Sequence, residues 1–208
     1  EGGIHIPADI KAYFEALRQI CDDNDWLLML DEVQSGIGRT GTWFAFQHTG
    51  VMPDVMSLAK GLGSGVPIGA CVAKGKAAEV FTPGKHGSTF GGNPFAMSAG
   101  LATLAIIEQE KLRENAEAMG DFIHQQFAEA FKDNAAIVNI RHAGLMIGIE
   151  LDRPCAELVK IALANKLLIN VTADKVIRLL PALIITQEEA QELVNRLVSV
   201  VDHFLKAA

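Results

Sequence analysis

A strand that ends in an acidic residue is predicted by the stretch Trp26-Leu27-Leu28-Met29-Leu30-Asp31. Five consecutive apolar residues are typical of a strand covered on both faces in a parallel sheet. Similar short runs follow over 55–59, which ends at Lys60, and over 68–73. Apolar residues at spacings of three and four predict an amphipathic helix over 10–21 before the first strand. Alternating strand and helix signals of this kind indicate an α/β domain.

The second half of the chain has a different pattern. Asn93 and Pro94 suit the N-cap and the first position of a helix. The apolar positions that follow predict one long linking helix over about 94–131. Two apolar runs between 137 and 151 flank His142-Ala143-Gly144 and predict a hairpin. These signals favour a smaller α+β domain after the first one.

Two more helices are expected near the C-terminus, over 155–165 and over 187–206. The second is opened by a capping box in which Thr186 and Glu189 are three residues apart. The apolar side chains of this last helix are more commonly part of a core than of a partner-binding groove.

The composition excludes several functional classes. The chain has 208 residues, 50% of them hydrophobic, with 18 Lys and Arg against 25 Asp and Glu, a net charge of −7. Affinity for nucleic acid comes mostly from clustered Lys and Arg, and the sequence has no such cluster, so we expect no nucleic-acid partner. The apolar stretch over 94–107 is shorter than the roughly 20 residues of a membrane span, so we expect no membrane insertion.

Cysteine and histidine usage points to a reducing compartment and to no metal site. Cys21, Cys71 and Cys155 are odd in number and far apart, which argues against a disulfide framework. The six histidines also lack metal-ligand spacing, so we interpret them as structural or surface residues. The chain opens on Glu1 without a signal peptide or an initiator Met, which suggests an internal fragment of a cytoplasmic protein.

Asp31 and Lys60 each end a predicted buried strand. Ligands of open α/β sheets bind outside the carboxyl ends of the strands, so both residues are candidates for one site. Taken singly, an Asp in this position is more commonly a turn former and a Lys a solvated side chain. The neighbouring residues decide between these interpretations.

Three segments resemble, in the expected order, the motifs of class III aminotransferases, which are enzymes of pyridoxal phosphate (PLP). They are Asp31-Glu32-Val33-Gln34-Ser35-Gly36-Ile37-Gly38-Arg39-Thr40-Gly41, Ser57-Leu58-Ala59-Lys60-Gly61 and His86-Gly87-Ser88-Thr89-Phe90-Gly91-Gly92-Asn93-Pro94. The resemblance is greatest to the branch of acetylornithine, succinyldiaminopimelate and succinylornithine aminotransferases. It implies the PLP-dependent transferase fold, with an aspartate-aminotransferase-like large domain. Residues 1–108 would be the C-terminal part of that large domain and 109–208 the small α+β domain.

The resemblance also implies roles for the first two motifs. Lys60 would form the aldimine with PLP and then move a proton between substrate and cofactor, for which a neutral amine is needed. Asp31 would face the pyridine nitrogen and keep it protonated. Val33 would pack on the face of the ring and Gln34 would hydrogen-bond its phenolic oxygen. For Glu32 we expect a structural role only.

The third motif implies a site shared between subunits. Thr89 would reach the cofactor phosphate of the other subunit, and Ser88 would lie near the substrate. Hydroxyls beside small residues suit a phosphate, although a Gly-rich turn by itself is weak support. We therefore expect a homodimer with shared active sites.

Arg178 is a lone cation in an apolar run. An unpaired charge there would be costly, so a structural ion pair and a functional role are about equally expected. By resemblance, Arg178 would bind a substrate carboxylate and, when idle, pair with a glutamate at the position of Glu1. Such a switch lets one pocket accept both glutamate and an ω-amine.

The predicted function is the transfer of the ω-amino group of N-acetylornithine, or of succinyldiaminopimelate or succinylornithine, to 2-oxoglutarate in arginine or lysine metabolism, with arginine biosynthesis as the expected pathway. An aminotransferase for 4-aminobutyrate or ornithine and a glutamate-semialdehyde aminomutase share the motifs and stay as alternatives. Family members are about twice as long as this chain. A catalytically incompetent fragment or a dimerisation scaffold is therefore an alternative of another class.

Overall fold

The computed structural model describes residue 4 and residues 6–207, and these form two compact units. Pro7–Arg113 make one unit. The residues from Glu114 onward, together with Ile4 and Ile6, make the other. Both units contain helices and strands, which confirms the predicted mixed α/β class.

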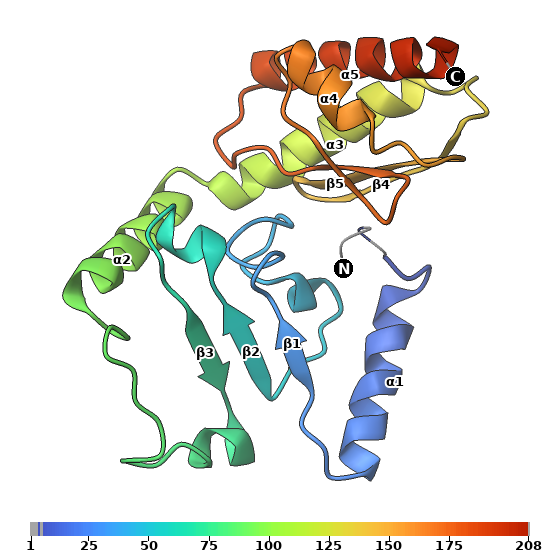
Figure 1. Ribbon diagram of the computed structural model, residues 1–208. Coiled ribbons are helices and arrows are strands. Elements are labelled where there is room, and N and C mark those ends of the chain that lie inside the picture. The colour runs from blue at the N-terminus through green and yellow to red at the C-terminus, as the bar shows by residue number, and fades with distance from the viewer. Residues whose placement is uncertain (1–3, 5, 208) are drawn as a thin grey trace. The chain divides into compact units, whose positions relative to one another are not determined.

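The first unit contains helix α1, Ile10–Asp23, and a three-stranded sheet in the order β1-β2-β3 (Figure 1). β1, Met29–Asp31, pairs in parallel with β2, Val55–Leu58, and β3, Ala70–Ala73, pairs antiparallel with β2. All three strands lie within the stretches that the sequence predicted.

The first strand is shorter and less covered than its apolar run suggested. The backbone N–H of Leu28 donates to Oδ2 of Asp54 at 2.8 Å, so the ladder starts only at Met29. Met29 of this strand is 65% exposed, and Val72 of β3 in the same sheet is 49% exposed. The prediction of a strand covered on both faces is therefore wrong for the described residues, which leave these side chains without an apolar layer.

Three one-turn 3₁₀ helices, Ala45–His48, Lys60–Gly63 and Gly75–Glu79, lie in the connections of this unit. Helix α2, Pro94–Gln109, is the last complete helix of the unit and begins as predicted. The Asn93 side chain accepts from the N–H of Ala96 at 3.0 Å, and Pro94 takes the first helical position.

The single helix predicted over about 94–131 is two helices in the structure. α2 ends at Gln109, and α3 extends over Leu112–Ala130. Lys111 lies between them with φ of +53°, in the left-handed region that ends many helices, and its N–H donates to the carbonyl of Glu108. Glycine is the usual residue for that conformation, so a lysine gave the sequence no stop signal.

The second unit is built on a four-stranded antiparallel sheet in the order β4-β5-β7-β6. β4, Ile137–Ala143, and β5, Met146–Leu151, form the hairpin predicted around Gly144, whose φ is +51°. The other two strands are β6, Asn170–Thr172, and β7, Val176–Leu179.

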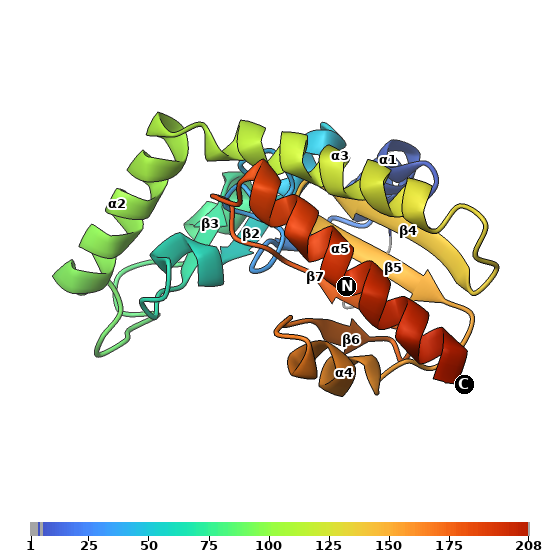
Figure 2. The same ribbon diagram turned by 90° about the horizontal axis from the view of Figure 1, so that it is seen from above.

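Helices α3 and α5 lie along one face of this sheet, as Figure 2 shows, and enclose its core. α5 extends over Gln187–Ala207 and opens with the predicted capping box of Thr186 and Glu189, which exchange bonds of 2.9 and 3.2 Å. α4, Leu158–Ala164, is shorter than the helix predicted over 155–165. The N–H of Cys155 instead donates to the carbonyl of Asp174.

The core between the helices and the sheet consists of fully buried side chains, including Ile123, Phe127, Ile147, Ile149 and Leu197. Each such side chain contributes about 1.5–3 kcal/mol relative to an exposed one. Among the described residues, no helix is long and apolar enough to cross a membrane.

Asp54 joins α1 to the start of the three-stranded sheet. Its Oδ2 accepts from Nη1 of Arg18 at 2.7 Å and from the N–H of Leu28 at 2.8 Å. Burial alone would raise the pKa of Asp54, but the bonds from Arg18 and from Leu28 outweigh it and lower the pKa. The stabilisation is therefore complete above the unfolded-state pKa of about 3.9 and is lost as the pH falls through the lower folded-state pKa.

We expect Asp54→Asn to lower the free energy of unfolding by about 1–2 kcal/mol at pH 7, because the charge-assisted bond to Arg18 is lost. The difference from the wild type should shrink as the pH falls below about 4. Urea titrations between pH 2.5 and 7 measure both quantities, with Asp23→Asn on the exposed side of α1 as control. A difference that stays constant with pH would contradict the assignment.

Candidate active site

The parallel register of β1 and β2 brings their carboxyl ends to the same edge of the sheet. Asp31, the last residue of β1, is directly opposite Ser57 of β2. The N–H of Glu32 donates to the carbonyl of Ser57 at 3.0 Å and continues the pairing. Lys60 follows β2 after Ala59. The two residues that the sequence paired thus leave neighbouring strands at one edge, where α/β sheets bind ligands.

The carboxylate of Asp31 is exposed and held in a fixed orientation. Its Oδ1 accepts from the N–H of Val33 at 2.9 Å and from the hydroxyl of Ser57 at 3.3 Å. Its Oδ2 has no hydrogen-bond partner among the residues that the structure describes. One oxygen is therefore committed to the protein, and the other can accept a proton-bearing group of a ligand.

Glu32 organises the turn that follows Asp31. Its buried carboxylate accepts from the hydroxyl of Ser35 at 2.5 Å and from the N–H of Phe46 at 2.9 Å. Its carbonyl accepts from the N–H of Gly36, and a Cβ on Gly36 would lie 2.8 Å from that oxygen. The turn therefore requires glycine at position 36, and Glu32 has the structural contacts expected from the sequence.

Val33 and Gln34 lie within this turn and are both half-buried. They follow Asp31 on the same short segment, so the contacts of Glu32 fix their backbone as well. The arrangement gives one edge of the sheet a carboxylate, an aliphatic side chain and an amide in sequence.

Lys60 begins a 3₁₀ turn over Lys60–Gly63 with φ of +46°. A non-glycine residue in this region is uncommon and is kept there by its surroundings. A Cβ on Gly63 would lie 2.6 Å from Cγ2 of Ile68, and one on Gly100 of α2 would lie 3.2 Å from Cδ1 of Ile68. The turn is thus packed on α2 through two glycines and one isoleucine.

The side chain of Lys60 is exposed, and its ammonium has no hydrogen bond or ion pair with any described residue. It differs in this from Lys76 in the same unit, which contacts Asp25. The amine is therefore available to a ligand at the edge where Asp31 lies.

Ser88 and Thr89 lie in an exposed turn that precedes α2. The Ser88 hydroxyl accepts from the N–H of Gly91 at 3.2 Å, and the N–H of Asn93 donates to the carbonyl of Phe90. The hydroxyl of Thr89 makes no hydrogen bond with another described residue.

Arg178 is half-buried on β7 in the second unit, and its Nη2 donates to Oδ1 of Asn170 at 3.2 Å. The pairing expected with Glu1 lies outside the described residues. Arg178 therefore has a polar partner in the sheet, and its substrate role stays a prediction.

Ser57 is a contributor that sequence reasoning missed. Its hydroxyl bonds to Asp31 and it occupies the opposite position in the ladder. A single hydroxyl within the apolar run over 55–59 was the available signal, but only the register shows which residue it faces.

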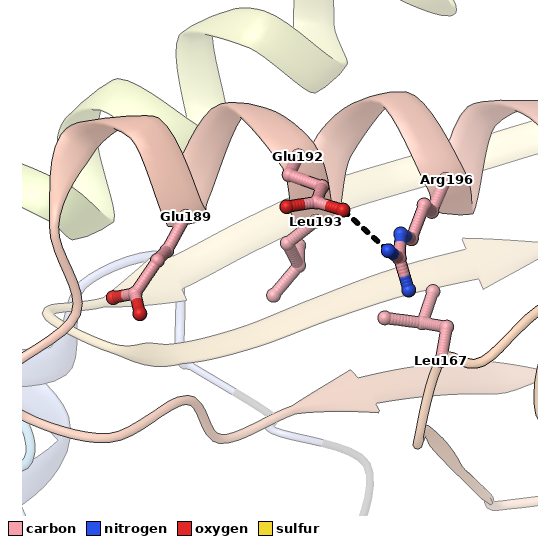
Figure 3. Close-up of a pocket in the computed structure, with 5 residues that line it drawn as sticks. All are labelled: Leu167, Glu189, Glu192, Leu193 and Arg196. Carbon is pink, nitrogen blue, oxygen red and sulfur yellow. Dashed lines mark hydrogen bonds and ion pairs between the residues drawn. The ribbon is translucent and has the colours of Figure 1, made fainter.

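A cavity of about 190 Å³ lies elsewhere, against the start of α5 (Figure 3). It is lined by Leu167, Glu189, Glu192, Leu193 and Arg196. Arg196 pairs with Glu192 and donates to the carbonyl of Lys166, so its polar groups already have partners. None of the predicted site residues lines it. The described part of the chain also contains no group of three His, Cys, Asp or Glu side chains that could hold a metal ion.

The profile of class-III aminotransferases matches residues 1–201, and the chain therefore belongs to the class-III aminotransferase family. It is 56% identical to the acetylornithine aminotransferase of Nitrosomonas europaea over 207 residues, which are 100% of this chain and 52% of that protein. It is 53% identical to acetylornithine aminotransferase 1 of Bordetella pertussis over 99% of this chain and 52% of that protein. The chain thus spans about half the length of these curated relatives.

Solved structures confirm the predicted PLP-dependent transferase fold. The ornithine aminotransferase of Toxoplasma gondii ME49 superimposes with a TM-score of 0.91 at 31% identity, over 99% of this chain and 50% of that one. The acetylornithine aminotransferase of Elizabethkingia anophelis gives 0.87 at 31% identity, over 98% of this chain and 52% of that one. The T. gondii enzyme crystallised with oxidised glutathione has PLP at partial occupancy in its active site.

Proposed function

We propose that the whole protein is an aminotransferase that moves the ω-amino group of N-acetylornithine to 2-oxoglutarate in arginine biosynthesis. The main support for this proposal is that Asp31 and Lys60 lie at the same edge of the sheet. The identity of 56% to an acetylornithine aminotransferase supports this substrate. Succinyldiaminopimelate and succinylornithine are chemically similar donors that the same site would accept.

The residues at this edge fit PLP, the cofactor of the family. Asp31 offers an oriented carboxylate with one oxygen uncommitted among the described residues, and Lys60 offers an accessible primary amine. Bound PLP supplies an aldehyde that condenses with amines and a pyridinium ring that withdraws electrons from the reacting carbon. A carboxylate is the group that keeps a pyridine nitrogen protonated, and an amine is the group that an aldehyde binds.

Each residue has a proposed task. Lys60 would hold the cofactor through its amine, and as a free amine it would carry the proton removed from the substrate carbon. Asp31 would accept a hydrogen bond from the protonated ring nitrogen, and the bonds that its Oδ1 accepts from Val33 and Ser57 would keep the carboxylate in that orientation. Val33 packs on the ring, and Gln34 donates to its phenolic oxygen.

The substrate and phosphate contacts complete the proposal. Arg178 binds a substrate carboxylate, because a guanidinium matches the two oxygens of that group. Thr89 binds the cofactor phosphate and Ser88 lies near the substrate. These assignments rest on the match of each residue to the family motif.

Ornithine is the second candidate donor, because an ornithine aminotransferase superimposes with a TM-score of 0.91. That enzyme is 31% identical to this chain, against 56% for the N. europaea acetylornithine aminotransferase. The two donors differ by an acetyl group on the α-nitrogen. Comparing their kcat/KM values with the full-length protein decides between them.

Lys60 is expected to carry the cofactor in the full-length, PLP-loaded protein. After borohydride reduction, peptide mapping should find the cofactor mass on the peptide that contains Lys60. Lys60→Ala should lower turnover of N-acetylornithine with 2-oxoglutarate by about 10²–10⁴-fold or more, because nucleophile and proton carrier are lost together. Lys76→Ala, at an exposed lysine of the same unit, should keep wild-type turnover. Cofactor mass on another lysine would contradict the assignment.

We also propose a homodimer whose active sites are shared. α2 is apolar around its circumference, but within the described chain only Ala96, Gly100 and Ile107 are buried. On its other sides Phe95 is 73% exposed and Leu101 is 72% exposed. A helix that is apolar on all sides is usually buried, which favours a partner surface over α2.

For the full-length protein, Leu101→Asp should shift the sedimentation coefficient from dimer to monomer, because a charge would be buried in the interface. Leu163→Asp on α4, where Leu163 is 61% exposed, should stay dimeric. A 1:1 mixture of unfolded Lys60→Ala and Thr89→Ala chains should regain about a quarter of the wild-type activity on refolding, because half the dimers then hold one intact site. A Leu101→Asp variant that stays dimeric would contradict an interface on α2. A refolded mixture that regains no activity would contradict shared active sites.

A further inference from the structure

Four positions form one row across the four-stranded sheet. Arg141 of β4 is opposite Gly148 of β5, Gly148 is opposite Arg178 of β7, and Arg178 is opposite Asn170 of β6. Directly opposite residues in neighbouring strands point to the same face. With strands about 4.8 Å apart, the Cα atoms of the two arginines are about 10 Å apart. Between them Gly148 has no side chain.

Ile4 fills the space over Gly148. A Cβ built on Gly148 would lie 3.4 Å from Cβ of Ile4, 3.5 Å from Cγ1 of Val176 and 3.7 Å from Cγ of Arg141. Ile4 is 4% exposed, and its φ is +51°, which a β-branched residue rarely adopts. Such a conformation persists only where the surroundings determine it strongly. Here the packing of Ile4 over Gly148 and its neighbours keeps Ile4 in this conformation.

Arg141 also holds Ile4 in this position, through the backbone carbonyl of Ile4. Its Nε donates to the carbonyl of Ile4 at 2.6 Å, while its Nη1 donates to Oε2 of Glu150 at 2.8 Å. The other carboxylate oxygen of Glu150 pairs with Nζ of Lys175 at 2.9 Å. Bonds from Lys175 and Arg141 lower the pKa of Glu150, so this carboxylate stays charged and fixes the planar guanidinium.

We propose that Arg141 is a positioning residue for carboxylate recognition at Arg178, acting through Ile4, and that Gly148 is the specificity-determining position that admits Ile4 between the two arginines. The inference rests on the proposed function, in which Arg178 binds the carboxylate of glutamate. Ile4 then forms an apolar wall in the same row as the Arg178 guanidinium. Its position determines where a carboxylate can approach.

Two half-reactions of the proposed enzyme depend on this wall unequally. Glutamate needs the guanidinium of Arg178 for its carboxylate. The ω-amine of N-acetylornithine reacts while Arg178 has no substrate carboxylate. A displaced Ile4 therefore impairs glutamate and spares N-acetylornithine, whereas general damage to the fold would impair both.

The test uses the full-length, PLP-loaded enzyme and steady-state kinetics in both directions, with N-acetylornithine or glutamate as the amino donor. Arg141→Ala should raise the apparent KM for glutamate about tenfold or more, with kcat and the KM for N-acetylornithine changed less than about threefold. Arg153→Ala is the matched control, because it removes an arginine of the same unit whose ion pair is with Asp152 and not with Glu150. It should leave both KM values within about threefold.

Gly148→Val keeps Arg141 and Glu150 but places a side chain in the space that Ile4 occupies. It should therefore raise the KM for glutamate in the same way. It provides the test if Arg141→Ala does not fold. Equal losses in both half-reactions, or an unchanged KM for glutamate, would overturn the inference while leaving the proposed function intact. A wild-type enzyme that reacts with neither substrate would overturn both.

Discussion

The parallel pairing of β1 with β2 is the constraint on which the candidate active site depends. It places Asp31 opposite Ser57, whose hydroxyl and carbonyl hold the end of β1. Lys60 leaves β2 at the same edge. A slip of one residue would turn every side chain of a strand to the opposite face. The register therefore controls both the direction of the carboxylate and its proximity to the lysine segment.

Much of the fold followed from local signals. Asn93 and Pro94 started a helix, Thr186 and Glu189 capped another, and Gly144 turned a hairpin, each through residues that act on their own backbone. The break at Lys111 was missed because a lysine, and not a glycine, takes the left-handed backbone conformation there. Burial of β1 was overestimated. An apolar residue such as Met29 is compatible with burial, but its identity does not show that another element of the described chain packs over it.

The candidate site was predictable to the extent that its chemistry follows strand ends. Asp31 and Lys60 could be paired from sequence because the carboxyl ends of parallel strands share an edge. The contact of Ser57 with Asp31 and the row through Arg141, Gly148 and Arg178 could not, because they depend on register between segments far apart in the chain. A family motif indicates which residues have which roles, whereas the strand register shows which contacts hold those residues in place.

In the proposed function, the carboxylate of Asp31 and the amine of Lys60 serve one PLP molecule. The most direct measurement is the ¹⁵N chemical shift of ring-labelled PLP in the full-length wild type and in Asp31→Asn. We expect a protonated ring nitrogen in the wild type at neutral pH and an unprotonated one in the variant, because the amide has no negative charge to stabilise the proton. An unprotonated nitrogen in the wild type, or the same shift in both proteins, would contradict it.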